Sequence, residues 1–255
     1  TGRRDSYGSK HHQQWMWHAK STNCITVDGE GQRKHSNASR GRIVAFHTSD
    51  DFDVVSGEAG EAYEGRLKQF RRHVLFVKPD LIVLYDRLEA PQPVTFEWRL
   101  HAPTEMKLGG QRDIRVVNGK AACKVAFLAP DGLKLAMTDK FDTPPRPRIK
   151  LTEWHLTAST PKPVDRVQFV TVLRPHRTTE KAPAEAKLAS VPGGMMLTAE
   201  AGGKRVVVLL AEKAGGEVAS ATLRATADVA AFRLDAAGKP TRAVFVNGQT
   251  VQTYP

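Results

Sequence analysis

Apolar and polar side chains alternate without a break in VTFEWRLHA, residues 94–102. One face of this stretch, if extended, carries only apolar side chains: Val94, Phe96, Trp98 and Leu100. The other face carries only polar ones: Thr95, Glu97, Arg99 and His101. A period of two is the signature of a β-strand with one face buried. The stretch therefore predicts a strand at the surface of a core.

Short runs of the same kind recur along the chain. They are CITVD (24–28), RIVAFHT (42–48), RHVLFV (72–77), LIVLYD (81–86), KVAFLAP (124–130), KLAMT (134–138), VQFVTVLRP (167–175), MMLTAE (195–200), RVVVLLAE (205–212) and AVFVNG (243–248). Pairs typical of tight turns separate many of them, among them Asp28-Gly29, Asn118-Gly119, Gly202-Gly203 and Asn247-Gly248. The spacing predicts an all-β fold: a large antiparallel β-sandwich of two sheets and roughly a dozen or more strands.

Little helix is expected. Residues 181–190 (KAPAEAKLAS) favour about two helical turns, and residues 10–20 favour an irregular segment or a short helix. Residues 1–255 are interpreted as one β-sandwich domain. Within it, roughly residues 182–255 are richer in Ala and Gly and form either outer strands or a small appended β subdomain.

The composition suggests a polyanionic partner. The 255 residues carry a net charge of +11, with 40% hydrophobic and 25% charged residues, so nucleic acid, anionic lipid and acidic polysaccharide are candidates. Nucleic acid is disfavoured because no strand interleaves basic and aromatic residues. No apolar stretch approaches the roughly 18 to 20 residues of a membrane span. The start TGRRDSYGS has no signal-peptide pattern and is typical of a processed product or a fragment.

Cys24 and Cys123 are the two cysteines, and both lie in apolar, strand-like runs. A disulfide between them stays open at this point, although two buried free thiols are favoured. Zinc held by cysteines is excluded, since no CxxC pair exists.

Two groups of motifs carry a resemblance to a known family. The first is YGSKHHQQW (7–15) followed by KSTNCITVDGEGQ (20–32). The second is GEA (57–59), AY (62–63), FRR (70–72), VKPD (77–80) and YDRL (85–88), with FEWRLHA (96–102) after them. In this order, over about residues 1–175, the chain resembles the C-terminal β-sandwich of heparinase II/III-like polysaccharide lyases.

The resemblance implies a periplasmic or secreted lyase that cuts an acidic, uronate-containing polysaccharide by β-elimination, with an N-terminal α/α-toroid joined to this sandwich. The family's His-x-His and aspartate would precede Thr1, and its remaining metal ligand, a histidine, is replaced here by Thr22. A neutral hydroxyl is a poor zinc ligand. We therefore expect no cofactor, no bound zinc and no lyase activity from this chain alone. His18 is the one residue nearby that could replace the missing ligand.

Six residues are expected to bind the substrate: Arg4, Tyr7, His11, His12, Lys20 and Asn23. Arg4 suits the carboxylate or sulfate groups of the polymer, and the others border the expected cleft. His101 and His155 are interpreted as hydrogen-bonded structural histidines. The run Arg71-Arg72-His73 is expected to direct one residue inward against a carboxylate such as Asp86, with the other two in solvent. A non-catalytic carbohydrate-binding or cell-surface sandwich is the alternative to the lyase.

Overall fold

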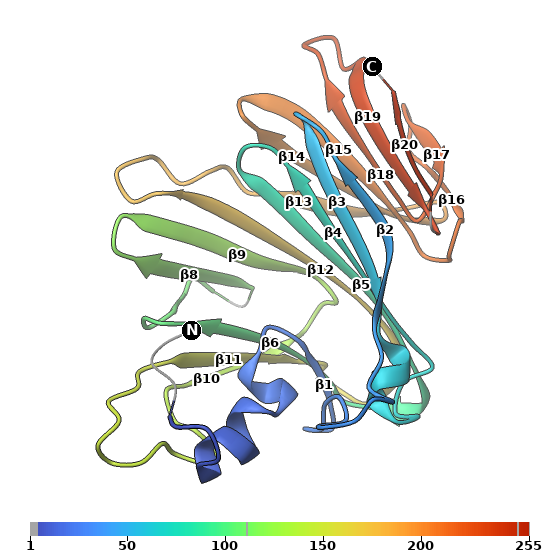
Figure 1. Ribbon diagram of the computed structural model, residues 1–255. Coiled ribbons are helices and arrows are strands. Elements are labelled where there is room, and N and C mark those ends of the chain that lie inside the picture. The colour runs from blue at the N-terminus through green and yellow to red at the C-terminus, as the bar shows by residue number, and fades with distance from the viewer. Residues whose placement is uncertain (1–4, 111, 249, 255) are drawn as a thin grey trace.

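The alternating stretch forms β6 (Phe96–Ala102), whose inward side chains Phe96, Trp98 and Leu100 are at most 6% exposed. The computed structural model describes residues 5–110, 112–248 and 250–254, and in this part of the chain all strands pair antiparallel (Figure 1). β6 belongs to a four-stranded sheet, here called the small sheet. Its order is β1 (Ile25–Val27), β6, β11 (Trp154–Ser159) and β10 (Lys134–Thr138).

An eight-stranded central sheet packs against the small sheet. Its order is β2 (Arg42–Thr48), β3 (Phe52–Glu58), β4 (Gln69–Val77), β5 (Leu81–Val94), β12 (Val164–Arg177), β9 (Ala121–Ala129), β8 (Asp113–Asn118) and β7 (Lys107–Leu108). In β5, Leu88 and Ala90 face the small sheet, whereas Leu81, Val83 and Tyr85 face the other way. The central sheet is therefore buried on both faces.

A six-stranded third sheet covers that second face. Its order is β13 (Lys187–Val191), β14 (Gly194–Ala201), β15 (Lys204–Ala211), β18 (Val229–Leu234), β19 (Pro240–Asn247) and β20 (Thr250–Tyr254). A hairpin of β16 (Glu217–Ala219) and β17 (Arg224–Thr226) packs on its outer side. The antiparallel all-β sandwich is confirmed. It has one more layer than the two expected, because residues from 187 onward form a sheet of their own.

The helical pieces are short: η1 (His12–Met16), η2 (Ala19–Ser21) and η3 (Gly60–Tyr63). The helix expected over residues 181–190 was wrong. Lys187–Val191 is a strand that pairs with β14, and this pairing prevails over helix propensity. Among the described residues, no helix has the length and apolar character to cross a membrane.

One fully buried carboxylate links the central and small sheets. Asp86 of β5 is 0% exposed and accepts hydrogen bonds from Arg72 Nε at 2.6 Å, Arg72 Nη2 at 2.8 Å and Trp98 Nε1 at 3.0 Å. The Arg72 guanidinium also lies over the Trp98 ring and donates to the backbone carbonyl of Asn23 at 3.2 Å. Arg72 thereby fixes the position of the backbone just before β1.

The expected inward pairing of the basic run with Asp86 is confirmed for Arg72, but its neighbours do not lie in solvent. His73 is 1% exposed and shares a 2.8 Å hydrogen bond with Ser56, and Arg71 pairs with Glu58 at 2.9 Å. Sequence reasoning missed this because strands buried on both faces carry inward side chains at every position. Cys24 and Cys123 are free, as favoured.

Replacing Asp86 tests this link. Asp86→Ala leaves Arg72 and the Trp98 indole unpaired in the core, and we expect it to lower the free energy of unfolding by about 3–5 kcal/mol. Asp86→Asn keeps one acceptor and should cost less. Urea unfolding followed by Trp fluorescence measures both. Glu217→Ala, which breaks an ion pair with Arg224 whose side chains are 52% and 71% exposed, is the control and should cost about 1 kcal/mol or less. Equal losses for Asp86→Ala and Glu217→Ala would contradict the assignment.

Candidate functional site

The outer face of the small sheet, which points away from the central sheet, is polar. The strand register places polar side chains side by side across it, in the pairs Thr26 and Glu97, Arg99 and Thr157, and His101 and His155. The N-terminal segment, residues 5–24, covers part of this face (Figure 1), and its Trp15 ring lies 4.8 Å from that of His155. The candidate site is built on this face.

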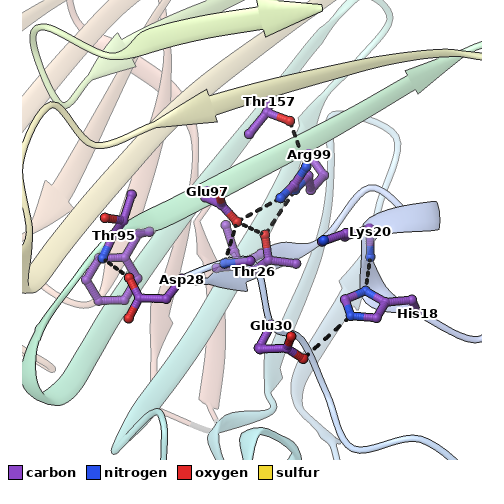
Figure 2. Close-up of polar contacts among 12 residues, drawn as sticks. His18, Lys20, Thr26, Asp28, Glu30, Thr95, Glu97, Arg99 and Thr157 are labelled. Carbon is purple, nitrogen blue, oxygen red and sulfur yellow. Dashed lines mark hydrogen bonds and ion pairs between the residues drawn. The ribbon is translucent and has the colours of Figure 1, made fainter. Parts of the chain in front are cut away.

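Arg99 ties three strands together at one end of the face, as Figure 2 shows. Its guanidinium donates to Thr26 on β1 at 3.0 Å, to Glu97 on β6 at 2.7 Å and to Thr157 on β11 at 2.7 Å. Glu97 also accepts from the backbone of Gly29 at 3.1 Å, in the Asp28-Gly29 turn that the sequence predicted. These hydrogen bonds connect β1, β6 and β11 through side chains, so the network forms a rigid base for the site.

A pocket of about 300 Å³ lies at the other end, beneath the N-terminal segment. Its walls include two imidazoles, an amide, a carboxylate and two aromatic rings, from His11, His101, Asn23, Glu153, Trp15 and Phe141. Its volume is near the lower limit for small-molecule sites. Imidazole, carboxylate and amide groups in one pocket suit a metal ion or a small polar ligand.

His101 and Glu153 of this pocket form a chemically distinctive cluster with His155, which lies beside them. They offer ligand atoms that all lie within 4.8 Å of one another. Burial lowers the pKa of His101 to about 4. Burial alone would raise the pKa of Glu153, but the adjacent rings of His155 and His101 bring it below its usual value. The expectation that both histidines are fully hydrogen-bonded was wrong: among the described residues, His101 Nε2 and both ring nitrogens of His155 have no hydrogen-bond partner.

Two of the six expected substrate-binding residues lie in this pocket. His11 is 1% exposed, and its Nδ1 lies 2.6 Å from the carbonyl oxygen of Thr143. Asn23 Oδ1 accepts from the backbone of His101 at 2.9 Å. Lys20 does not line the pocket and pairs with Asp142 at 3.1 Å. Arg4 lies outside the described residues. Substrate binding by these residues stays a prediction.

The other two, Tyr7 and His12, belong to a row of aromatic and imidazole rings on the N-terminal segment, here called the ring row. Tyr7 lies 4.6 Å from His12, His12 5.5 Å from Trp17, and Trp17 3.9 Å from His35, measured between ring centroids. Tyr7 is 86% exposed and Trp17 40%. Sequence reasoning missed Trp17 and His35, because only the chain's path brings the 31–35 loop beside the segment.

Lysines flank the ring row. Burial first, and then the charges of Lys34 and Lys20, lower the pKa of His18, the residue next to Trp17. Along the chain, Lys34 directly precedes His35 of the row and Lys20 follows Trp17 by three residues. A flat apolar surface beside positive charge suits a sugar ring that carries an anionic group.

The residues at the position implied for zinc by the family resemblance do not fit that metal. Thr22 is exposed, and its hydroxyl donates to the carbonyl of Ala19 at 3.0 Å. His18, the suggested replacement, accepts from the backbone of Lys20 at 3.0 Å and lies 3.7 Å from Glu30 (Figure 2). Neither side chain is directed to a shared metal position.

A larger hollow of about 860 Å³ lies between the central and third sheets and is lined by Arg87, Glu89, Arg166 and Lys213, among others. None of the expected residues that the structure describes lines it. Its opposite charges already pair in part, since Arg166 binds Glu89 at 3.1 Å, so we place the candidate site on the small sheet.

A family model described as heparinase II/III-like, C-terminal, matches residues 1–249. No curated protein sequence matches the chain.

Solved structures share the fold. The heparan sulfate lyase HepC from Pedobacter heparinus superimposes with a TM-score of 0.64 at 16% identity, over 81% of this chain and 33% of that one. Heparinase III, the BT4657 gene product, gives 0.61 at 16% identity, over 79% and 32%. Another heparinase III gives 0.58 at 14% identity, over 79% and 31%. The chain thus spans about a third of the length of these structures.

Arg99 variants test the hydrogen-bond network that Arg99 forms across the small sheet. Arg99→Ala removes hydrogen bonds to three strands and leaves Glu97 without its cation, so the free energy of unfolding should fall by about 2–3 kcal/mol. Arg99→Lys keeps the positive charge but loses the planar guanidinium donors. Its free energy of unfolding should therefore lie between those of Arg99→Ala and wild type. Arg115→Ala, at an exposed strand position, is the matched control and should change stability by less than about 0.5 kcal/mol. Denaturant unfolding gives all three values. A loss for Arg99→Ala no larger than that for Arg115→Ala would refute the network's role.

Proposed function

The chain belongs to the heparinase II/III-like C-terminal family, and from this premise we propose that it is the β-sandwich part of a polysaccharide lyase. The parent enzyme cuts an acidic, uronate-containing polysaccharide by β-elimination. Its remaining catalytic groups come from an N-terminal α/α-toroid. We place the parent in the periplasm or outside the cell, where a polymer of this kind is met.

The observation that carries the proposal is the ring row with its flanking lysines. Trp17 and Tyr7 offer exposed apolar faces to sugar rings, and the net charge of +11 attracts a polyanion. In this function the ring row, which includes His12, binds and orients the polymer together with Lys20 and Arg4. His11 and Asn23 shape the pocket beneath it.

β-Elimination also needs a base for the proton α to the uronate carboxylate and an acid for the leaving oxygen. Tyrosine is the usual acid in the family, as the resemblance implies. Tyr63 and Tyr85 are buried and donate to backbone carbonyls at 2.8 and 2.6 Å, and burial raises the pKa of each. Tyr7 is the exposed one among the tyrosines whose side chains are described. We infer that this chain alone is inactive.

One observation favours the alternative of a non-catalytic carbohydrate-binding or cell-surface module. Thr22 replaces the family's ligand histidine, and its hydroxyl is occupied within the chain by Ala19. Such a module would use the same ring row.

The inactivity is tested on the purified chain with heparin, heparan sulfate and alginate. We expect no rise in the ultraviolet absorbance of an unsaturated uronyl product above that of a boiled sample, because the parent's acid and base are incomplete here. A sustained rise over this control would show that the chain holds a complete catalytic centre.

Polysaccharide binding is tested by titration calorimetry with the same polymers. Trp17→Ala should weaken binding by about 1–2 kcal/mol, roughly 5- to 30-fold, because one stacking face is lost. Added salt should weaken binding by wild type, since the lysine contribution is screened. Phe46→Ala, which removes a 65% exposed ring on β2, is the control and should bind as wild type does. No binding by wild type, or equal losses in both variants, would contradict the role of the row.

A further inference from the structure

Strand geometry gathers His101, Glu153 and His155 on the outer face of the small sheet. His101 on β6 is the direct cross-strand neighbour of His155 on β11. Glu153 precedes His155 by two residues, and side chains two apart along an extended chain share one face. One ligand from β11, a second from the residue directly before that strand and a third from β6 therefore converge on one face.

The spacing is close to that of a metal site. Glu153 Oε1 and His155 Nε2 lie 3.3 Å apart, and all three ligand atoms lie within 4.8 Å of one another. Bonds of about 2.0–2.1 Å in a tetrahedron place ligand atoms roughly 3.4 Å apart. The carboxylate and the His155 ring already have this separation, and the His101 ligand atom lies within 4.8 Å of both.

Three imidazole nitrogens of the cluster have no hydrogen-bond partner among the described residues, although His155 Nε2 lies beside the Glu153 carboxylate. His155 is 6% exposed, yet neither of its ring nitrogens makes a hydrogen bond with the described residues, and neither does His101 Nε2. Leaving a buried polar atom unpaired costs about 1–3 kcal/mol. A bound cation would supply the missing partner.

The surroundings set the tautomer that a metal requires. Asn23 Oδ1 accepts from the backbone nitrogen of His101 at 2.9 Å and lies 3.2 Å from His101 Nδ1. Since an amide oxygen only accepts, the proton of the neutral ring belongs on Nδ1, which leaves the Nε2 lone pair free. Trp15 and Phe141 pack on His155 at 4.8 and 5.0 Å and fix that ring. The adjacent pocket leaves space for a water as fourth ligand.

We propose that His101, Glu153 and His155 bind one divalent transition-metal ion, with zinc preferred by the two imidazoles and one carboxylate. The ion joins β6 to β11 beneath the N-terminal segment. The sequence led us to expect no zinc, because only His18 was considered as a replacement for the ligand missing at Thr22. The sheet register brings together a different set, which no spacing along the chain revealed.

The test uses the 255-residue chain without a polyhistidine tag, stripped with a chelator, reloaded with Zn²⁺ and dialysed. Elemental analysis should give about one zinc per chain for wild type and for His18→Ala. Glu153→Gln and His101→Gln each remove one ligand, and calorimetry should show Zn²⁺ binding at least roughly 100-fold weaker. Asn23→Ala, which removes the orienting acceptor, should weaken binding about 10- to 100-fold.

Thermal unfolding separates loss of ligation from loss of the fold. Zn²⁺ should raise the unfolding temperature of wild type, because it binds only the folded chain, and should not raise that of Glu153→Gln, a near-isosteric change. Less than stoichiometric zinc on wild type, unchanged affinity in Glu153→Gln or His101→Gln, or zinc lost only in His18→Ala would overturn the proposal. No polysaccharide is present in these measurements, so their outcome is separate from that of the proposed function.

Discussion

The buried carboxylate of Asp86 is the interaction on which the site depends. A carboxylate removed from water is stable only when its oxygens are fully paired, and Arg72 with the Trp98 indole supplies three donors. The same guanidinium holds the Asn23 carbonyl, and the Asn23 side chain holds the backbone of His101. One charge inside the core thus fixes where the N-terminal segment meets the outer face of the small sheet.

The central sheet explains why that carboxylate can be so deeply buried. Because it packs against a sheet on each side, side chains of both parities along β5 lie inside. Arg87, one residue after Asp86, is therefore buried as well and pairs at 3.0 Å with Asp228, the residue directly before β18 of the third sheet. Successive charged residues of one strand each join the central sheet to a different neighbour, so the three layers are linked by paired charges as well as by apolar area.

Much of this could be predicted from the sequence where one face of a strand is buried and the other is not. The period of two in β6 predicted the strand itself, the side chains that face the core and the side chains that face outward. The pattern could not reveal the third sheet, since strands buried on both faces, such as RVVVLLAE, lose alternation. KAPAEAKLAS has the composition of a helix, but pairing with β14 prevailed over propensity. His101 and Asn23 were visible as residues, but their contact depends on register, which no local pattern fixes.

The outer face of the small sheet divides into two chemically different halves, and the division explains how one sheet can be both scaffold and site. Around Arg99 each guanidinium nitrogen donates to a side chain of the sheet, on β1, β6 or β11, so the network is closed within the sheet. Around His155 the rings of Trp15 and Phe141 fix the imidazole in place without using its nitrogens, one of which faces the Glu153 carboxylate. A group that is held rigidly but left unsatisfied is pre-organised for binding. The sheet therefore places its binding capacity where its internal hydrogen bonding ends, beneath the segment that carries the exposed rings.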